Sequence, residues 1–170
     1  MKLKQTLALL LLLAAVSVKG QTNWVKQALD NRVAVKFPAA PQPSAVNGGV
    51  RYQLKDKDSV IYSAILIDLK VAANLDSAKL APLKDMPEFA EGMKTGLGKS
   101  LPGVDFGTVT MGTWQGQSSY TFSGSTAKKT IVYGNIVLIG SKVYFLAAMV
   151  PDGVATKTKD DFFATLELTK

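Results

Sequence analysis

The chain has 170 residues with 20 basic and 13 acidic side chains, a formal net charge of +7, and neither histidine nor cysteine. The missing imidazoles and thiols exclude catalytic triads built on His or Cys, and they exclude such ligands for zinc, copper or haem. The basic residues are scattered apart from Lys128-Lys129, and no aromatic side chains alternate with them, so we expect no nucleic-acid binding.

The first 20 residues have the order of a secretory signal peptide: Lys2 and Lys4, an apolar run from Leu7 to Val16, and the small residue Gly20. The run is about half of the roughly 20 apolar residues that a membrane-spanning helix needs, so we expect no stable membrane anchor. No cysteine follows it, which argues against a lipid anchor. Cleavage after Gly20 predicts a periplasmic or secreted protein of one globular domain, residues 21–170, with 17 basic and 13 acidic side chains.

The first half of this domain predicts three strands. Residues 31–37, NRVAVKF, alternate between polar and apolar, and the proline-rich residues 38–49 after them predict a loop. Residues 50–54, VRYQL, and 59–69, SVIYSAILIDL, are separated by a polar turn and predict an antiparallel pair. The second of these runs is apolar on both faces, so both sides of the sheet should be covered there.

Residues 74–101 change in composition and predict helices. Asn74 and Asp76 suit helix capping, and Pro87 suits a first helical turn. We therefore expect a short helix, a break, and a second helix from about Pro87 to Lys99. One apolar stripe of this second helix faces a core and consists of Phe89, Met93 and Leu97.

The second half predicts four strands and a terminal helix. The strands are VDFGTVTMGTW, QSSYTFSG, TIVYGNIVLI and KVYFLAAMV, and the last two are joined by Gly140-Ser141, which suits a type II′ turn. The terminal segment TKTKDDFFATLEL predicts a helix with Phe162, Phe163 and Leu166 on its apolar side. Together the elements predict an α+β fold: an antiparallel sheet of about six strands with helices on both faces, an α/β/α sandwich.

A Gly-Lys-Ser lies within EGMKTGLGKSLPG, residues 91–103, and raises the question of a phosphate-binding loop. That loop has the pattern G-x-x-x-x-G-K-S after a buried strand and before a helix. Here Met93 occupies the position of the first glycine, and Pro102 blocks a following helix. We interpret the segment as a helix that ends at glycines.

Other candidates for chemistry have simpler interpretations. Ser125 and Lys128 imitate a Ser-Lys pair, but Ser125 lies between strands and not at a helix start. Three carboxylate pairs could serve acid/base chemistry or calcium, yet each fits a turn or the first turn of a helix, and none has calcium-loop spacing. These pairs are Asp56/Asp58, Glu88/Glu91 and Asp160/Asp161. We expect no catalytic residue, no metal site and no cofactor.

Several stretches resemble the PsbP-like fold. They are the export signal, NRVAVKFPAAP, SVIYSAILIDL, the helical middle, Gly116 and Tyr120 in a G-x-x-x-Y pattern, KVYFLAAMVPDG and DDFFATLEL. The group includes photosystem II extrinsic subunits, Ran-binding Mog proteins and many bacterial exported proteins. The resemblance spans nearly all of the mature chain and implies an α/β/α sandwich. It implies no shared activity, because the members do different things, and the metal-binding histidines of some photosystem members have no counterpart here.

These observations predict an exported, non-catalytic binding or accessory module that contacts another envelope or secreted protein. The candidate binding residues are Trp24, Trp114 and Tyr120, since an aromatic side chain among small polar residues can serve as a contact point. The competing interpretation of both tryptophans is that they close the edge of the core. Two other functions stay open: a carrier of a lipid or metabolite, which needs an apolar cavity between sheet and helices, and a hydrolase that uses carboxylates or Ser-Lys.

Overall fold

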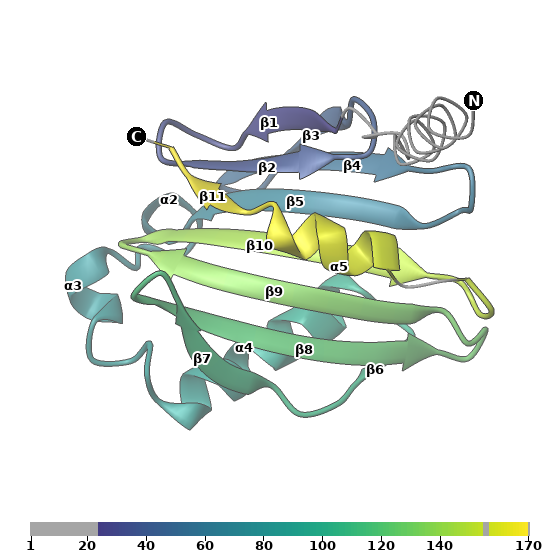
Figure 1. Ribbon diagram of the computed structural model, residues 1–170. Coiled ribbons are helices and arrows are strands. Elements are labelled where there is room, and N and C mark those ends of the chain that lie inside the picture. Colours follow the sequence, from purple (N-terminus) through teal and green to yellow (C-terminus); the bar gives the residue numbers. More distant parts are fainter. Residues whose placement is uncertain (1–23, 155–156, 170) are drawn as a thin grey trace, which may run out of the picture.

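The computed structural model describes residues 24–154 and 157–169, so the predicted signal peptide lies outside the described residues. The described chain forms an eight-stranded antiparallel sheet and a smaller three-stranded one (Figure 1). In the main sheet the order is β3-β4-β5-β10-β9-β8-β6, with β7 also paired to β8. Its strands are β3 (Gln42–Val46), β4 (Gly49–Lys55), β5 (Ile61–Asp68), β6 (Val104–Phe106), β7 (Thr110–Trp114), β8 (Gln117–Thr126), β9 (Ile131–Ile139) and β10 (Lys142–Val150).

The smaller sheet has the order β1-β2-β11 and consists of β1 (Val25–Ala28), β2 (Val33–Phe37) and β11 (Glu167–Leu168). It lies with α5 (Lys157–Ala164) on one face of the main sheet. Val35 and Phe37 of β2 and Phe162 of α5 share a buried cluster with Tyr62 and Tyr144 of the main sheet. This second sheet was not predicted from the sequence.

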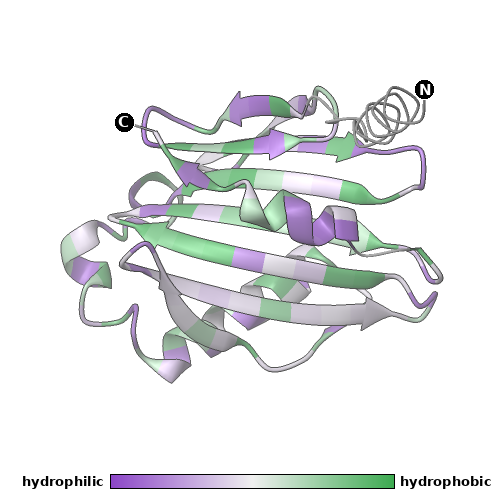
Figure 2. Cartoon of the chain, in the orientation of Figure 1, coloured by the Kyte–Doolittle hydropathy of each residue, from purple (hydrophilic) through white to green (hydrophobic). Residues whose placement is uncertain are grey.

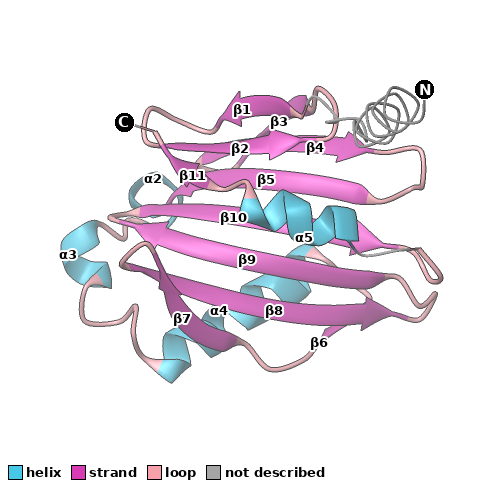
Figure 3. Ribbon diagram, in the orientation of Figure 1, coloured by secondary structure: helices cyan, strands magenta, loops and turns pink. Residues whose placement is uncertain are grey.

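The opposite face carries α3 (Ser77–Leu80) and α4 (Pro87–Ser100), and α4 crosses behind β8 and β9 in Figure 3. The predicted stripe of Phe89, Met93 and Leu97 packs on the core of this face, which confirms it. Asp76 caps α3 by accepting from the Lys79 N–H, and Pro87 begins α4, as predicted. Asn74 ends the short helix α2 (Leu69–Ala73) in the left-handed conformation, so its cap lies at the opposite end from the one expected.

The expected count of about six strands was too low, because the main sheet has eight. One additional strand is β3, which falls in the segment predicted as a loop. The other arises because residues 104–114 form two strands, β6 and β7, which pair with different parts of β8. β7 and β8 are pale in Figure 2, in keeping with their Ser, Thr and Gly content.

The central hairpin has the predicted geometry. Ile139 pairs with Lys142 across the two-residue turn, and φ is +63° at Gly140, as a type II′ turn requires. The apolar character of β9 and β10 on both sides follows from their position, because each contributes to both buried clusters. None of the helices within 24–154 and 157–169 is long and apolar enough to cross a membrane.

Candidate functional site

A pocket of about 330 Å³ lies between the main sheet and the C-terminal end of α4. Its floor comes from neighbouring strands that present side chains on one face: Arg51 of β4 pairs with Ile65 of β5, which pairs with Phe145 of β10. The volume falls within the range of small-molecule sites, about 300 to 1,000 Å³. The apolar residues that line the pocket are Val46, Ile65, Ile67, Leu97, Leu101, Val132, Phe145, Ala147 and Met149.

Small side chains give the pocket its depth. In the next row of the sheet Gln53 pairs with Ser63, which pairs with Ala147. Ser63 and Ala147 are both small side chains, and both line the pocket. The helix contributes Leu97, Ser100 and Leu101 to the opposite wall. The result is an apolar pocket with a small number of polar groups, which is the usual composition of a ligand site.

Arg51 is the single charged side chain among the described residues that line this pocket. Its Nε donates to Ser44 Oγ at 3.2 Å, and no ion pair between described residues includes it. Beside it, Gln53 Nε2 donates to Ser63 Oγ at 3.3 Å. This group was not predicted from the sequence. The available signal was that Arg51 and Gln53 share one face of a strand that pairs with a run predicted to be covered on both sides.

The Gly-Lys-Ser segment forms the end of α4 and not a phosphate-binding loop. Residues 87–100 are helical throughout, and Ser100 Oγ donates to the Gly96 carbonyl at 3.0 Å. A Cβ added at Gly92, Gly96 or Gly98 would meet nothing within 4 Å, so these glycines serve no close packing. Each lowers helix stability relative to alanine by about 1 kcal/mol. The wall of the pocket is thus an intrinsically weak helical segment.

A second, more open pocket of about 590 Å³ includes Trp24. Pro38 and Leu54 contribute apolar surface, and the rest of the lining is mostly charged, with Lys55, Lys57, Asp56, Asp58 and Asp161. The two charge signs alternate there, and Asp161 is already paired with Lys157 at 2.8 Å. This lining favours no single ligand chemistry.

The three sequence-predicted binding residues do not form one site. Trp24 and Trp114 are each half-buried and pack against the core cluster on the face covered by α5 and the small sheet. Tyr120 is 1% exposed, on the opposite face, and its hydroxyl donates to the Lys84 carbonyl. Burial raises the pKa of Tyr120 to about 12. Tyr120 is therefore a core residue with no surface to offer a partner.

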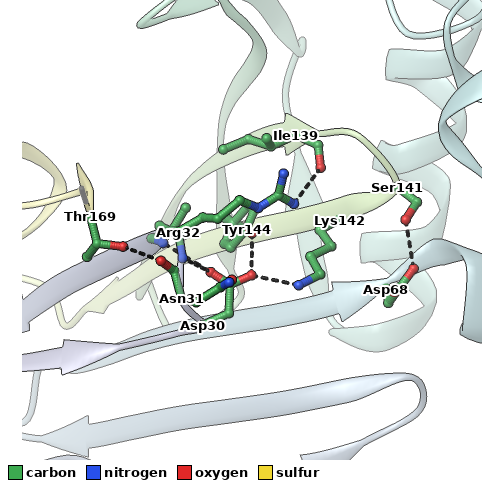
Figure 4. Close-up of polar contacts among 10 residues, drawn as sticks. Asp30, Asn31, Arg32, Asp68, Ile139, Ser141, Lys142, Tyr144 and Thr169 are labelled. Carbon is green, nitrogen blue, oxygen red and sulfur yellow. Dashed lines mark hydrogen bonds and ion pairs between the residues drawn. The ribbon is translucent and has the colours of Figure 1, made fainter.

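The most connected polar group of the described chain surrounds Asp30 (Figure 4). Its Oδ2 accepts from Lys142 Nζ and from the Tyr144 hydroxyl, both at 2.7 Å. Its Oδ1 accepts from the backbone N–H groups of Arg32 and Val33 at 2.8 and 3.0 Å. The group ties the turn between β1 and β2 to β10 of the main sheet.

The environment of Asp30 fixes its charge. Burial of the side chain opposes ionisation, but the hydrogen bonds from Lys142 and Tyr144 outweigh it and lower the pKa to about 2. Burial, with the hydrogen bond to Asp30, raises the pKa of Tyr144. A carboxylate ionised at all ordinary pH values and surrounded by donors is a structural acceptor, and it is poorly suited to proton transfer.

The candidate Ser-Lys pair is not brought together by any hydrogen bond between described residues. Ser125 is exposed in β8, and Lys128 is exposed in the turn after it. A different pair does meet: Lys84 Nζ donates to Ser118 Oγ at 2.9 Å, and Ser118 Oγ donates to Asp85 Oδ1 at 2.8 Å. Lys84 is also 3.3 Å from Asp85 Oδ2. An ammonium paired with a carboxylate acts as a donor, so this group fastens the loop before α4 to β8.

The carboxylate pairs have structural partners. Asp56 Oδ1 accepts from the N–H groups of Asp58 and Val60 within its turn, both at 2.9 Å. Glu91 pairs with Lys94 at 3.7 Å, and Asp160 pairs with Lys159 at 2.6 Å. Within the part of the chain that the structure describes, no three acidic side chains come together as a metal site would require.

Comparison with solved structures identifies the fold. The cyanobacterial PsbP (CyanoP) of Synechocystis matches with a TM-score of 0.55 and 12% identity over 88% of this chain and 95% of that one. The chain therefore has the PsbP-like fold, as the resemblance implied. No family model matches the sequence, and no curated protein matches it.

Two weaker structural matches were also found. PA94 of Pseudomonas aeruginosa, a protein of unknown function described as a putative regulator, has a TM-score of 0.47 and 10% identity over 83% of this chain and 92% of that one. LpqN of Mycobacterium tuberculosis, involved in cell envelope biogenesis, has a TM-score of 0.40 and 20% identity over 91% of this chain and 88% of that one. Function must be argued from the site, because one fold serves many activities.

Proposed function

We propose that the protein is an exported, non-catalytic module that binds a small, largely apolar ligand in the pocket between the main sheet and α4. The observation that carries the proposal is the pocket itself, about 330 Å³ in volume, lined by nine apolar and five polar side chains. Removal of such apolar surface from water stabilises the complex with a ligand by about 25 cal/mol per Å². The predicted signal peptide supports a location outside the cytoplasm.

The absence of catalytic function is part of the proposal. The chain has no His or Cys, and the polar side chains that line the pocket include no carboxylate that could act as a general base: they are Asn47, Arg51, Gln53, Ser63 and Ser100. Binding without turnover is the function that such a lining performs. A carrier or ligand-dependent accessory protein needs no more than this.

Filling the pocket tests the proposal. Leu97→Trp places a larger side chain on the wall, and Lys99→Trp places the same side chain on an exposed position of the same helix as a control. Native mass spectrometry of protein isolated from its own host is expected to find a bound small molecule in the wild type and in Lys99→Trp, but not in Leu97→Trp. Equal occupancy in all three proteins, or none in the wild type together with no binding of added decanol, would refute the proposal.

Contact with another envelope or secreted protein is a second candidate function. It is supported by Trp114, which remains half-buried at the end of β7, and by the free edge of that strand, which pairs only with β8 among the described strands. A free edge with a nearby aromatic side chain is a surface that partner strands use. Trp114 packs with the cluster on the face of the main sheet opposite the ligand pocket.

A further inference from the structure

The ligand's chemistry follows from the charge distribution around the pocket between the sheet and α4. Among its described lining residues there is one cation, Arg51, and no Asp, Glu or Lys. The carboxylates of the described chain that form ion pairs do so with lysines elsewhere, at Lys26, Lys84, Lys94, Lys142, Lys157 and Lys159. The pocket therefore presents an uncompensated positive charge at the margin of an apolar surface.

The geometry leaves the terminal nitrogens of Arg51 available. Its Nε donates to Ser44 Oγ at 3.2 Å. No hydrogen bond between described residues uses its Nη1 or Nη2. A guanidinium held by one nitrogen, with a free pair of N–H groups, matches the two oxygens of a carboxylate, because the fork geometry permits two parallel hydrogen bonds.

The apolar part of the pocket begins directly beside this cation. Arg51 pairs with Ile65 across the sheet, and Phe145 follows Ile65 in the same row. Leu97 and Leu101 lie on the opposite wall. A ligand whose head reaches Arg51 therefore places its other end among aliphatic and aromatic side chains.

We propose that the ligand is a single-chain amphiphile with a carboxylate head, of the fatty-acid class, held with its head at Arg51 and its chain between the sheet and α4. The inference rests on the proposed function and adds the sign of the head group. A neutral amphiphile would leave the Arg51 charge unpaired when it covers the guanidinium, and a cationic one would be repelled by it.

Three probes with the same chain length test the head group: decanoate, decanol and decylamine. Binding is followed in the exported form of the protein, purified from its host, by the NMR shifts of the Ile65, Leu97 and Leu101 methyl groups. We expect decanoate to bind most tightly, and Arg51→Gln to weaken decanoate about tenfold without weakening decanol, because only decanoate loses charged hydrogen bonds at its head. Lys55→Gln, which removes a charge from the same strand outside the pocket, is the control and should change neither affinity.

A second variant guards against a folding defect. Arg51→Lys keeps the charge but loses the fork, and is expected to retain part of the preference for decanoate over decanol. If decanoate and decanol bind equally and neither arginine variant changes this, the carboxylate assignment is wrong while the pocket remains a ligand site. If no probe shifts the pocket methyl groups, the proposed function itself fails.

Discussion

Asp30 links the turn of the small sheet to the main sheet through Lys142 and Tyr144. We expect Asp30→Asn to lower the free energy of unfolding by about 2 to 3 kcal/mol, because Lys142 and Tyr144 lose a charged acceptor in a largely buried setting. Urea unfolding at neutral pH measures this. The control is Asp105→Asn, an exposed residue of β6. Equal stability of the two variants would contradict a stabilising role for the Asp30 group.

The same residue makes stability depend on acid. The pKa of Asp30 is lowered from 3.8 to about 2 in the folded protein, so its contribution is fully present above pH 4 and is lost as the pH falls through 2. The shift corresponds to about 2 kcal/mol. The stability difference between wild type and Asp30→Asn should therefore shrink by about that amount between pH 5 and pH 2. A difference that stays constant over this range would show that Asp30 is not the titrating group.

At the scale of elements, α4 contains three glycines, each of which lowers the stability of the helix relative to alanine. We expect Gly92→Ala and Gly96→Ala each to raise the free energy of unfolding by up to about 1 kcal/mol, since the added Cβ meets no atom within 4 Å and alanine favours the helix. Gly134→Ala in β9 is the contrasting variant. Its Cβ would lie 2.1 Å from the Phe122 ring, so it should destabilise the protein by about 1 to 3 kcal/mol. Urea unfolding compares the three, and destabilisation by the helix variants would show that their glycines have a structural role.

The sequence predicted the elements that carry their own pattern and missed those that depend on neighbours. The alternation of Val33, Val35 and Phe37 and the stripe along α4 were sufficient for β2 and α4. The strand β3 was missed because Pro43 argues against a strand, yet a proline is tolerated at a sheet edge, where its missing N–H faces no partner. The two-residue strand β11 exists only because β2 lies beside it, which no local pattern records.

At the scale of the whole molecule, some features of the site could be predicted from the sequence, and those that depend on distant segments could not. The composition was enough to argue against His and Cys chemistry, and the two apolar faces of β9 and β10 predicted a central position. The pocket could not be predicted, because it arises where Ser63 and Ala147, distant in sequence, lie side by side beneath the end of α4. Arg51 could not be singled out from its own strand, because the exposed Lys55 of the same strand is also a cation and does not line the pocket.

The two faces of the main sheet should act independently in binding. Trp114 packs with the cluster beneath α5, whereas the pocket belongs to the cluster beneath α4. We therefore expect Trp114→Ala to leave ligand occupancy unchanged in native mass spectrometry, and to weaken retention of any envelope protein that the wild type captures. Arg51→Gln should lower ligand occupancy and leave the retention of the envelope protein unchanged, so it serves as the matched control. Loss of the ligand in Trp114→Ala would contradict this independence, because it would show that the two surfaces are energetically coupled through the sheet.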